Sequence, residues 1–424
     1  MLTQLQVPSV IPLVAHLSPL SYRSLLSSLA NAATQLQQTR YLIQSIYDLR
    51  LELVNQSNTS ASTHYRTLEA FAESLDEFVH GVEGWCAERE EEIFYAQRGH
   101  GKRLVVSLFG FEGSLRQRMA GVLEVVTAVL RDIAHAAASA PLMTNDEPPP
   151  IHANSITSYH PSILSTLILD GLFAAIREQL SIGETATSQG LLSIFTHTIQ
   201  PIWSSIGRWL RDGMEAVEDE ESLGTLKHDQ ELFIEKGEVP LGSPDFWDEG
   251  YRLRKVADAV DYSTAAQQRD AVPAVFKPIA QDVLAAGKAI GLLRAMGLET
   301  PASFRMQEHK WLSFKQLYAR SEETASKEVE LTIPALAGES QIPDATAGMR
   351  RASDALVATV QDYAMSICRV AHSQLIQVLK EDCELSRHLS GMQALFLMRR
   401  GDILSEWCDA VFAKVCLGVY VLLA

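Results

Sequence analysis

PIWSSIGRWLRDGMEAVEDEES, residues 201–222, opens the stretch of sequence that decides the fold. Its apolar residues recur at steps of three and four, so they share one face of a predicted helix. Gly213 is expected to end or bend this helix before the acidic run from Glu215 to Glu221, because glycine is weak in helix interiors. The residues of the apolar face, all expected to be buried, are Ile202, Ile206, Trp209, Leu210 and Met214.

ELFIEKGEVPLGSPDFWDEGYRLR, residues 231–254, follows the acidic run and contains too many turn residues for a long helix. Large apolar side chains stand at Phe233 and Ile234, and again at Phe246, Trp247 and Tyr251. Aromatic side chains contribute large apolar areas when they are buried. We therefore expect these residues to anchor a loop to the core, with Trp247 and Tyr251 themselves in that core.

VPAVFKPIAQDVLAAGKAIGLLRAMG, residues 272–297, predicts a second long helix, with Gly297 at the position of a C-terminal cap. The expected apolar stripe comprises Ile279, Val283, Ala286, Ile290, Leu293 and Met296. The pair Gly287-Lys288 could be mistaken for the end of a phosphate-binding loop, but Asp282 replaces the first glycine of that motif and Ala289 its hydroxyl residue. We expect instead a close helix contact at Gly287, with Lys288 reaching outward.

Helical periodicity recurs through most of the remaining chain. Residues 139–161 contain three successive prolines and are expected to form a flexible loop insertion. Residues 321–348 have no strong period and are interrupted by Pro334, Gly338 and Pro343, which favours a boundary. The predicted helices span residues 19–54, 63–96, 104–138 (as one or two helices), 162–180 and 189–212, with a further long helix through Ala355 to Leu379. The fold class predicted is all-α, an elongated stack of helical bundles.

The composition excludes several classes of protein. The chain has 424 residues, a net charge of −16 and 47% hydrophobic residues, which is ordinary for a folded protein. The acidic balance argues against non-specific nucleic-acid binding, which needs a basic face. Five scattered cysteines without metal-ligand spacing favour reduced thiols in the cytosol or nucleus. No apolar run is long enough to span a bilayer, so neither nucleic acid nor membrane is expected as a partner.

No pattern of catalytic residues stands out. The sequence has no H-E-x-x-H and no G-x-S-x-G motif. Cys383 and His388 are five positions apart, which would turn them to different faces of a helix, so a thiol nucleophile is not expected. An α-helical enzyme such as an isoprenoid synthase would need aspartate-rich D-D-x-x-D motifs, which are absent. We therefore predict no enzymatic activity, no cofactor and no metal site.

The order of parts between residues 201 and 297 resembles the N-terminal grip domain of the gamma-tubulin complex component family, also called the spindle pole body component family. In that domain a helix with a Trp-x-x-x-Gly-like element precedes an acidic stretch, a Phe-containing segment, a Trp–Tyr pair, a Val-Pro turn and a helix with Gly-Lys near its middle. Each element alone is weak, and their shared order makes the resemblance fairly specific. The matching residues are Trp209, Gly213, Phe233, Trp247, Tyr251, Pro273, Gly287 and Lys288.

A second segment resembles the opening of the C-terminal grip domain of the same family. The matching residues are His388, Leu389, Leu395 to Leu397, Gly401 and Asp402, followed by Ile403 where the family has Phe. The resemblance implies an N-terminal grip-like helical domain over residues 1–320, a linker over 321–348, and the start of a gamma-tubulin-binding domain over 349–424. That last domain would be truncated, because the family's domain normally continues well beyond Ala424. All of these signature residues are expected to be structural.

The resemblance implies a structural subunit of the gamma-tubulin ring complex, which scaffolds microtubule nucleation through lateral packing of subunits. The implied partners are other gamma-tubulin complex components and gamma-tubulin itself, whose contact region would be largely missing from this chain. The implied location is the cytoplasm and cytoskeleton, at the microtubule-organising centre or spindle pole body. The prolines, the divergent loops and Ile403 favour a member of the component 5 or 6 type.

An alternative interpretation is an unrelated helical scaffold, such as the rod subunit of a vesicle-tethering complex. Such a rod would share the long amphipathic helices. It would lack the ordered series that runs from Trp209 and Gly213, through Trp247 and Tyr251, to Gly287-Lys288. This series therefore favours the gamma-tubulin complex interpretation.

Overall fold

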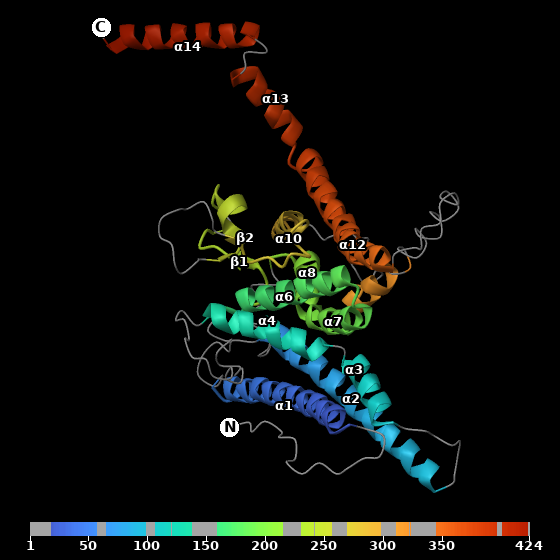
Figure 1. Cartoon of the computed structure of the whole chain (residues 1–424). Helices are drawn as coiled ribbons and strands as arrows, with labels where there is room; N and C mark the ends of the chain where they lie inside the picture. Colours follow the sequence, from blue (N-terminus) through green and yellow to red (C-terminus); the bar gives the residue numbers. More distant parts are fainter. Residues whose placement is uncertain are drawn as a thin grey trace, which may run out of the picture.

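The computed structural model describes residues 18–56, 65–98, 107–119, 121–137, 159–214, 230–240, 242–256, 269–297, 311–321, 323, 345–396 and 401–422. Within these ranges the chain is mainly helical, and the predicted all-α stack of helices is confirmed (Figure 1). The acidic run and most of the loop predicted over 139–161 lie outside the described residues.

The N-terminal part of the described structure contains the helices α1 (Pro19–Gln56), α2 (Arg66–Gln97), α3 (Leu108–Met119) and α4 (Val122–Ala137). α1 packs against the other three. It begins where the Ser18 hydroxyl accepts a hydrogen bond from the Ser21 N–H at 3.1 Å, as a serine at a helix start is expected to do. The stretch predicted as one or two helices forms two, and Gly121 before α4 has a φ of 69°, a conformation that glycine adopts readily.

In the described part of the chain, the centre contains the helices α6 (Pro161–Ile182), α7 (Thr185–Thr198), α8 (Gln200–Asp212), α10 (Ala280–Ala295) and α12 (Ala345–Glu381). α6 packs against α4, α7 and α12, and α10 packs against α8 and α12. The helix predicted over 189–212 is interrupted at Ile199 and forms α7 and α8. Pro201 explains the interruption, because it has no N–H to donate to the preceding turn.

Short strands connect α8 to α10, which confirms that residues 231–254 do not form a long helix. β1 (Ile234–Lys236) pairs antiparallel with β2 (Tyr251–Leu253), with Ile234 opposite Leu253. Between them lies one π-helical turn, η1 (Phe246–Gly250). A second small pair joins β3 (Lys255–Val256) to β4 (Arg269–Asp270).

One continuous apolar core joins the central helices. Its middle is an aromatic group in which Trp203 of α8 lies 4.5 Å from Trp311 and 6.0 Å from Phe276, measured between ring centroids. Phe314 of the short helix over 314–321 and Tyr363 of α12 complete the group. The Trp203 indole N–H donates to the carbonyl of Leu312 at 2.8 Å. Segments more than a hundred residues apart in the chain are thereby fixed to one another.

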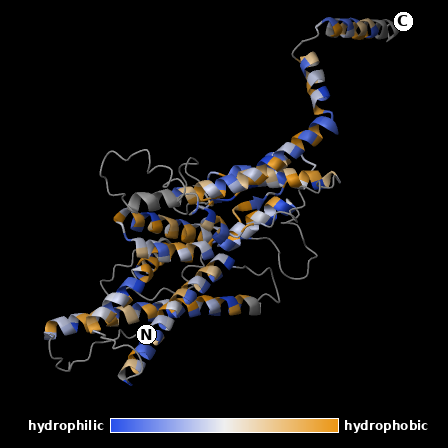
Figure 2. Ribbon diagram, turned by 90° about the vertical axis from the view of Figure 1, so that its right-hand side faces the viewer, coloured by the Kyte–Doolittle hydropathy of each residue, from blue (hydrophilic) through white to orange (hydrophobic). Residues whose placement is uncertain are grey.

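The C-terminal helices leave this body. α12 contributes Leu356, Val360, Ala364, Cys368 and Ala371 to the common core. Beyond it, α13 (Leu385–Phe396) and α14 (Gly401–Leu422) extend outward as an arm (Figure 1). Apolar residues continue along this arm outside the packed body (Figure 2). Among the described helices, none combines the length and apolar character needed to cross a membrane.

Candidate functional site

The signature residues between 209 and 288 gather where α8 crosses α10. Trp209 is 0% exposed, and its indole N–H donates to the Val283 carbonyl of α10 at 2.9 Å. A Cβ added at Gly287 would lie 2.1 Å from the Trp209 Nε1 atom. The indole therefore occupies the space that any other side chain at position 287 would need. The close helix contact predicted at Gly287 is confirmed.

Gly213 allows the end of α8 to meet the backbone of α10. Its φ is 63°, and its N–H donates to the Trp209 carbonyl at 2.9 Å, so it ends the helix as predicted. A Cβ at Gly213 would lie 2.6 Å from the Gly291 backbone nitrogen. The four-residue spacing from Trp209 to Gly213 is thus matched by the spacing from Gly287 to Gly291. Both pairs serve one helix crossing.

The prediction that Trp247 lies in the core is wrong. Trp247 is 41% exposed, whereas its neighbour Phe246 is buried against Tyr251, with ring centroids 6.1 Å apart. The π-helical turn explains why Phe246 is buried instead of Trp247, because it directs Phe246 toward Gly250 and Tyr251. Tyr251 is buried as predicted, and its ring lies 5.3 Å from that of Trp209.

The prediction that Lys288 reaches outward is also wrong. Lys288 is only 4% exposed. Its ammonium group donates a short hydrogen bond to the Trp247 backbone carbonyl and lies 5.6 Å from the centroid of the Trp247 ring. Burial lowers the pKa of Lys288, and nearby Asp248 opposes that shift. Lys288 therefore fixes the turn that contains Trp247 onto α10.

Phe233 and Pro273 lie at the turn that precedes α10. Phe233 is buried, and its ring lies 6.4 Å from that of Phe276. Pro273 is buried and begins the turn before α10, where the Asp170 carboxylate of α6 accepts a hydrogen bond from the Ala274 N–H at 2.6 Å. Burial raises the pKa of Asp170, while that hydrogen bond and Lys277 lower it. Of the apolar stripe predicted for α10, all are buried except Met296, which lies beyond the end of the helix.

The second set of signature residues lies on the arm, away from the helix crossing. His388 and Leu389 are exposed on α13, and Gly401 and Asp402 are exposed at the start of α14. The large exposed apolar side chains here follow helical spacing and give the arm a partly apolar surface. They are Leu385, Leu389, Met392 and Phe396 on α13, and Ile403, Trp407, Val411, Phe412 and Val415 on α14.

Residues 4–382 match the model of the family described as gamma tubulin complex component N-terminal. The chain belongs to the gamma-tubulin complex component family. The match covers the whole body and ends one residue after α12. No curated protein matches the chain.

Membership of the gamma-tubulin complex component family implies a role in microtubule nucleation, within a complex that contains gamma-tubulin and related components. It also implies a cytoskeletal location at microtubule-organising centres. The family is one of structural complex subunits. In the described part of the chain, no group of His, Cys, Asp or Glu is arranged to hold a metal ion.

The sequence did not reveal a buried residue that joins the segment before β1 to the start of α2. Glu231, just before β1, accepts hydrogen bonds from the Thr67 N–H at 3.0 Å and the Thr67 hydroxyl at 3.2 Å. Thr67 lies in the first turn of α2, whose own N-cap residue, Tyr65, makes no side-chain cap. A carboxylate at a helix N-terminus satisfies free N–H groups and the helix dipole. No local sequence signal could reveal a cap 164 residues away.

A half-buried polar group beside β2 was also missed. The Arg254 guanidinium lies 3.3 Å from His160 Nε2 and 3.4 Å from the Glu235 carboxylate. The Nδ1 atom of His160 caps the start of α6, because it accepts a hydrogen bond from the Ser162 N–H at 3.4 Å and lies 3.1 Å from the Ser162 hydroxyl. Burial, assisted by Arg254, lowers the pKa of His160, and Glu235 opposes that shift. The group thus holds a neutral histidine at the start of α6.

Proposed function

We propose that this chain is a structural subunit that packs laterally against other gamma-tubulin complex components and thereby scaffolds microtubule nucleation. The observation that carries the proposal is the family match over residues 4–382. The continuous core from α1 to α12 supports it, because a subunit that holds its neighbours at a fixed geometry must itself be rigid.

We also propose that the N-terminal grip-like unit extends to the end of α12, rather than ending at residue 320 before a linker. α12 packs against α10 and α6, and five of its side chains belong to the common core. The family match ends at residue 382, one residue after this helix. The C-terminal grip-like segment would then begin with α13, where the signature residues His388 and Leu389 stand.

The arm formed by α13 and α14 is, in this proposal, the first part of the gamma-tubulin-binding domain. Its exposed apolar residues form a surface that the body does not cover. Phe396, at 77% exposed, is the most prominent of them on α13.

The test is co-purification of the tagged chain with gamma-tubulin and, in parallel, with other gamma-tubulin complex components. Recovery of the components without gamma-tubulin supports a lateral scaffold. Gamma-tubulin that is recovered through the arm should be lost when Leu389 is replaced by glutamate. Ser390→Glu on the same helix is the matched control and should leave the recovery unchanged. Recovery of no complex component would overturn the proposal.

A further inference from the structure

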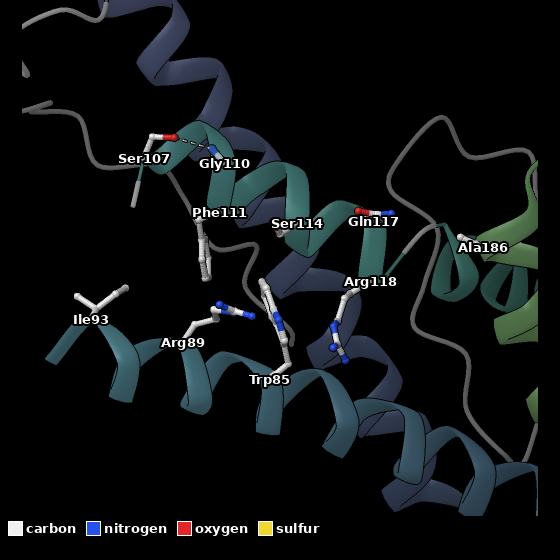
Figure 3. Close-up of a pocket in the computed structure, with 10 residues that line it drawn as sticks. All are labelled: Trp85, Arg89, Ile93, Ser107, Gly110, Phe111, Ser114, Gln117, Arg118 and Ala186. Carbon is white, nitrogen blue, oxygen red and sulfur yellow. Dashed lines mark hydrogen bonds between the residues drawn. The ribbon is translucent and has the colours of Figure 1, made fainter. Parts of the chain in front are cut away.

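A pocket of about 660 Å³ lies between α2 and α3, near α7, and has no part in the helix crossing described above. Figure 3 shows Trp85, Arg89 and Ile93 on one side and Phe111, Ser114 and Arg118 on the other. The volume lies within the range of pockets that bind small ligands, about 300–1,000 Å³.

The centre of the pocket is a stack of aromatic rings and guanidinium groups. The rings of Trp85 and Phe111 are stacked, with centroids 5.5 Å apart. The guanidinium of Arg89 lies 5.8 Å from the Trp85 ring centroid, and that of Arg118 lies 5.6 Å from it. Contact with an aromatic face restricts a guanidinium while leaving N–H donors at its edge. A ligand that uses those donors therefore loses less side-chain entropy on binding.

The two arginines differ in their charge partners. Arg89 pairs with Glu92 on its own helix, with 2.5 Å between nitrogen and oxygen. Among the described residues, Arg118 makes no ion pair, and its contact is with the Trp85 ring. Of the described residues that line the pocket, Arg118 is thus the arginine whose charge no neighbouring carboxylate neutralises. That matches a ligand with a single negative charge.

The walls of the pocket also favour a ligand that carries an apolar group. Ile93 and Phe111 line it beside the guanidinium groups, and Ala186 of α7 closes one end. The acidic residues of α2 beyond Arg89 do not line the pocket. The negative charges of these residues, Glu90, Glu91 and Glu92, disfavour an anion on the α2 side of the pocket. The anionic group of the ligand should therefore lie against Arg118 on α3.

We propose that this pocket binds a peptide segment in which an aspartate or glutamate lies next to a large apolar side chain. The carboxylate accepts a bidentate hydrogen bond from Arg118, and the apolar side chain packs against Phe111 and Ile93. A carboxylate fits better than a phosphate monoester, because a dianion would require a second free cation and Arg89 is already paired. This inference does not rest on the proposed scaffold function.

The test uses the full chain and two fluorescent peptides with blocked ends, Ser-Leu-Asp-Phe-Ser and Ser-Leu-Asn-Phe-Ser, in a polarisation assay. We expect the aspartate peptide to bind at least about tenfold more tightly than the asparagine peptide, as expected for loss of one charged hydrogen-bonded pair. Arg118→Gln should remove this preference. Arg116→Gln is the matched control, because Arg116 is exposed on the same helix and does not line the pocket.

A ¹⁹F spectrum of the protein labelled with 5-fluorotryptophan locates the binding. The Trp85 signal, assigned through Trp85→Phe, should shift on addition of the aspartate peptide alone. Equal binding of both peptides, no binding of either, or an unchanged preference in Arg118→Gln would overturn the proposal. Tighter binding of the corresponding phosphoserine peptide would also overturn it, in favour of a phosphate site.

Discussion

Replacement of Gly287 by alanine tests whether the signature residues exist to permit the crossing of α8 over α10. The added methyl carbon would stand 2.1 Å from Nε1 and 2.2 Å from Cε2 of Trp209. Real side chains do not approach so closely, so the indole must move. That movement removes the indole from its bonding distance of 2.9 Å to the Val283 carbonyl.

The magnitude follows from opposing effects. Alanine in place of glycine stabilises an unobstructed helix by about 0.5–1 kcal/mol. Forcing a methyl group into a packed core costs about 1–3 kcal/mol. The lost indole hydrogen bond adds about 1 kcal/mol to that cost. We therefore expect Gly287→Ala to lower the free energy of unfolding by about 1–3 kcal/mol.

The assay is urea unfolding followed by circular dichroism, in which a lower midpoint at an unchanged slope reports lost stability. The control is Gly84→Ala on α2, where an added Cβ meets no atom within 4 Å and should stabilise the helix. In a Trp209→Phe background the cost of Gly287→Ala should shrink, because the obstructing indole atoms are gone. Equal stabilisation by both glycine replacements would refute the packing argument.

Three further predictions concern the surrounding residues. Trp247→Ala should lower the free energy of unfolding by less than about 1.5 kcal/mol, because the side chain is 41% exposed. Trp209→Ala should lower it by about 3–5 kcal/mol, because that side chain is 0% exposed. Coinciding thermal melts of the two variants would contradict this difference in burial. Glu231→Ala should lower the free energy of unfolding by about 1–2 kcal/mol and speed amide hydrogen exchange in the first turn of α2. Glu231→Gln should have a smaller effect on both. Unaltered exchange in that turn would show that the cap is unimportant. His160 has a folded pKa below its unfolded value of about 6.5, so the unfolded chain binds more protons in that window and stability is lost as pH falls below about 6.5. Urea midpoints measured from pH 7.5 to 5 should therefore fall more steeply for the parent than for His160→Asn, and parallel curves would exclude this linkage.

Local pattern was sufficient for most of the helices. Apolar residues at steps of three and four marked α2, α4, α8 and α10, because a helix that packs against a core buries one face. Gly213 and Gly297 marked helix ends, and both have positive φ. Turn residues in 231–254 correctly excluded a long helix, since they disfavour continuous helical hydrogen bonding.

Other features depend on contacts that no local pattern contains. Periodicity cannot tell Phe246 from Trp247, because the π-helical turn decides which of the two faces Tyr251. Lysine is normally exposed, yet Lys288 is buried because a carbonyl from a distant loop accepts its hydrogen bond.

The sequence by itself determined the helical class, the helix ends at Gly213 and Gly297, and the family, because each rests on the spacing or order of residues along the chain. Only the tertiary structure decided that α12 belongs to the body, that Glu231 caps α2, and that Arg89 and Arg118 meet across Trp85. The physical reason is that burial and pairing are set by neighbours in space. Those neighbours come from helices whose order along the chain does not specify which faces will meet.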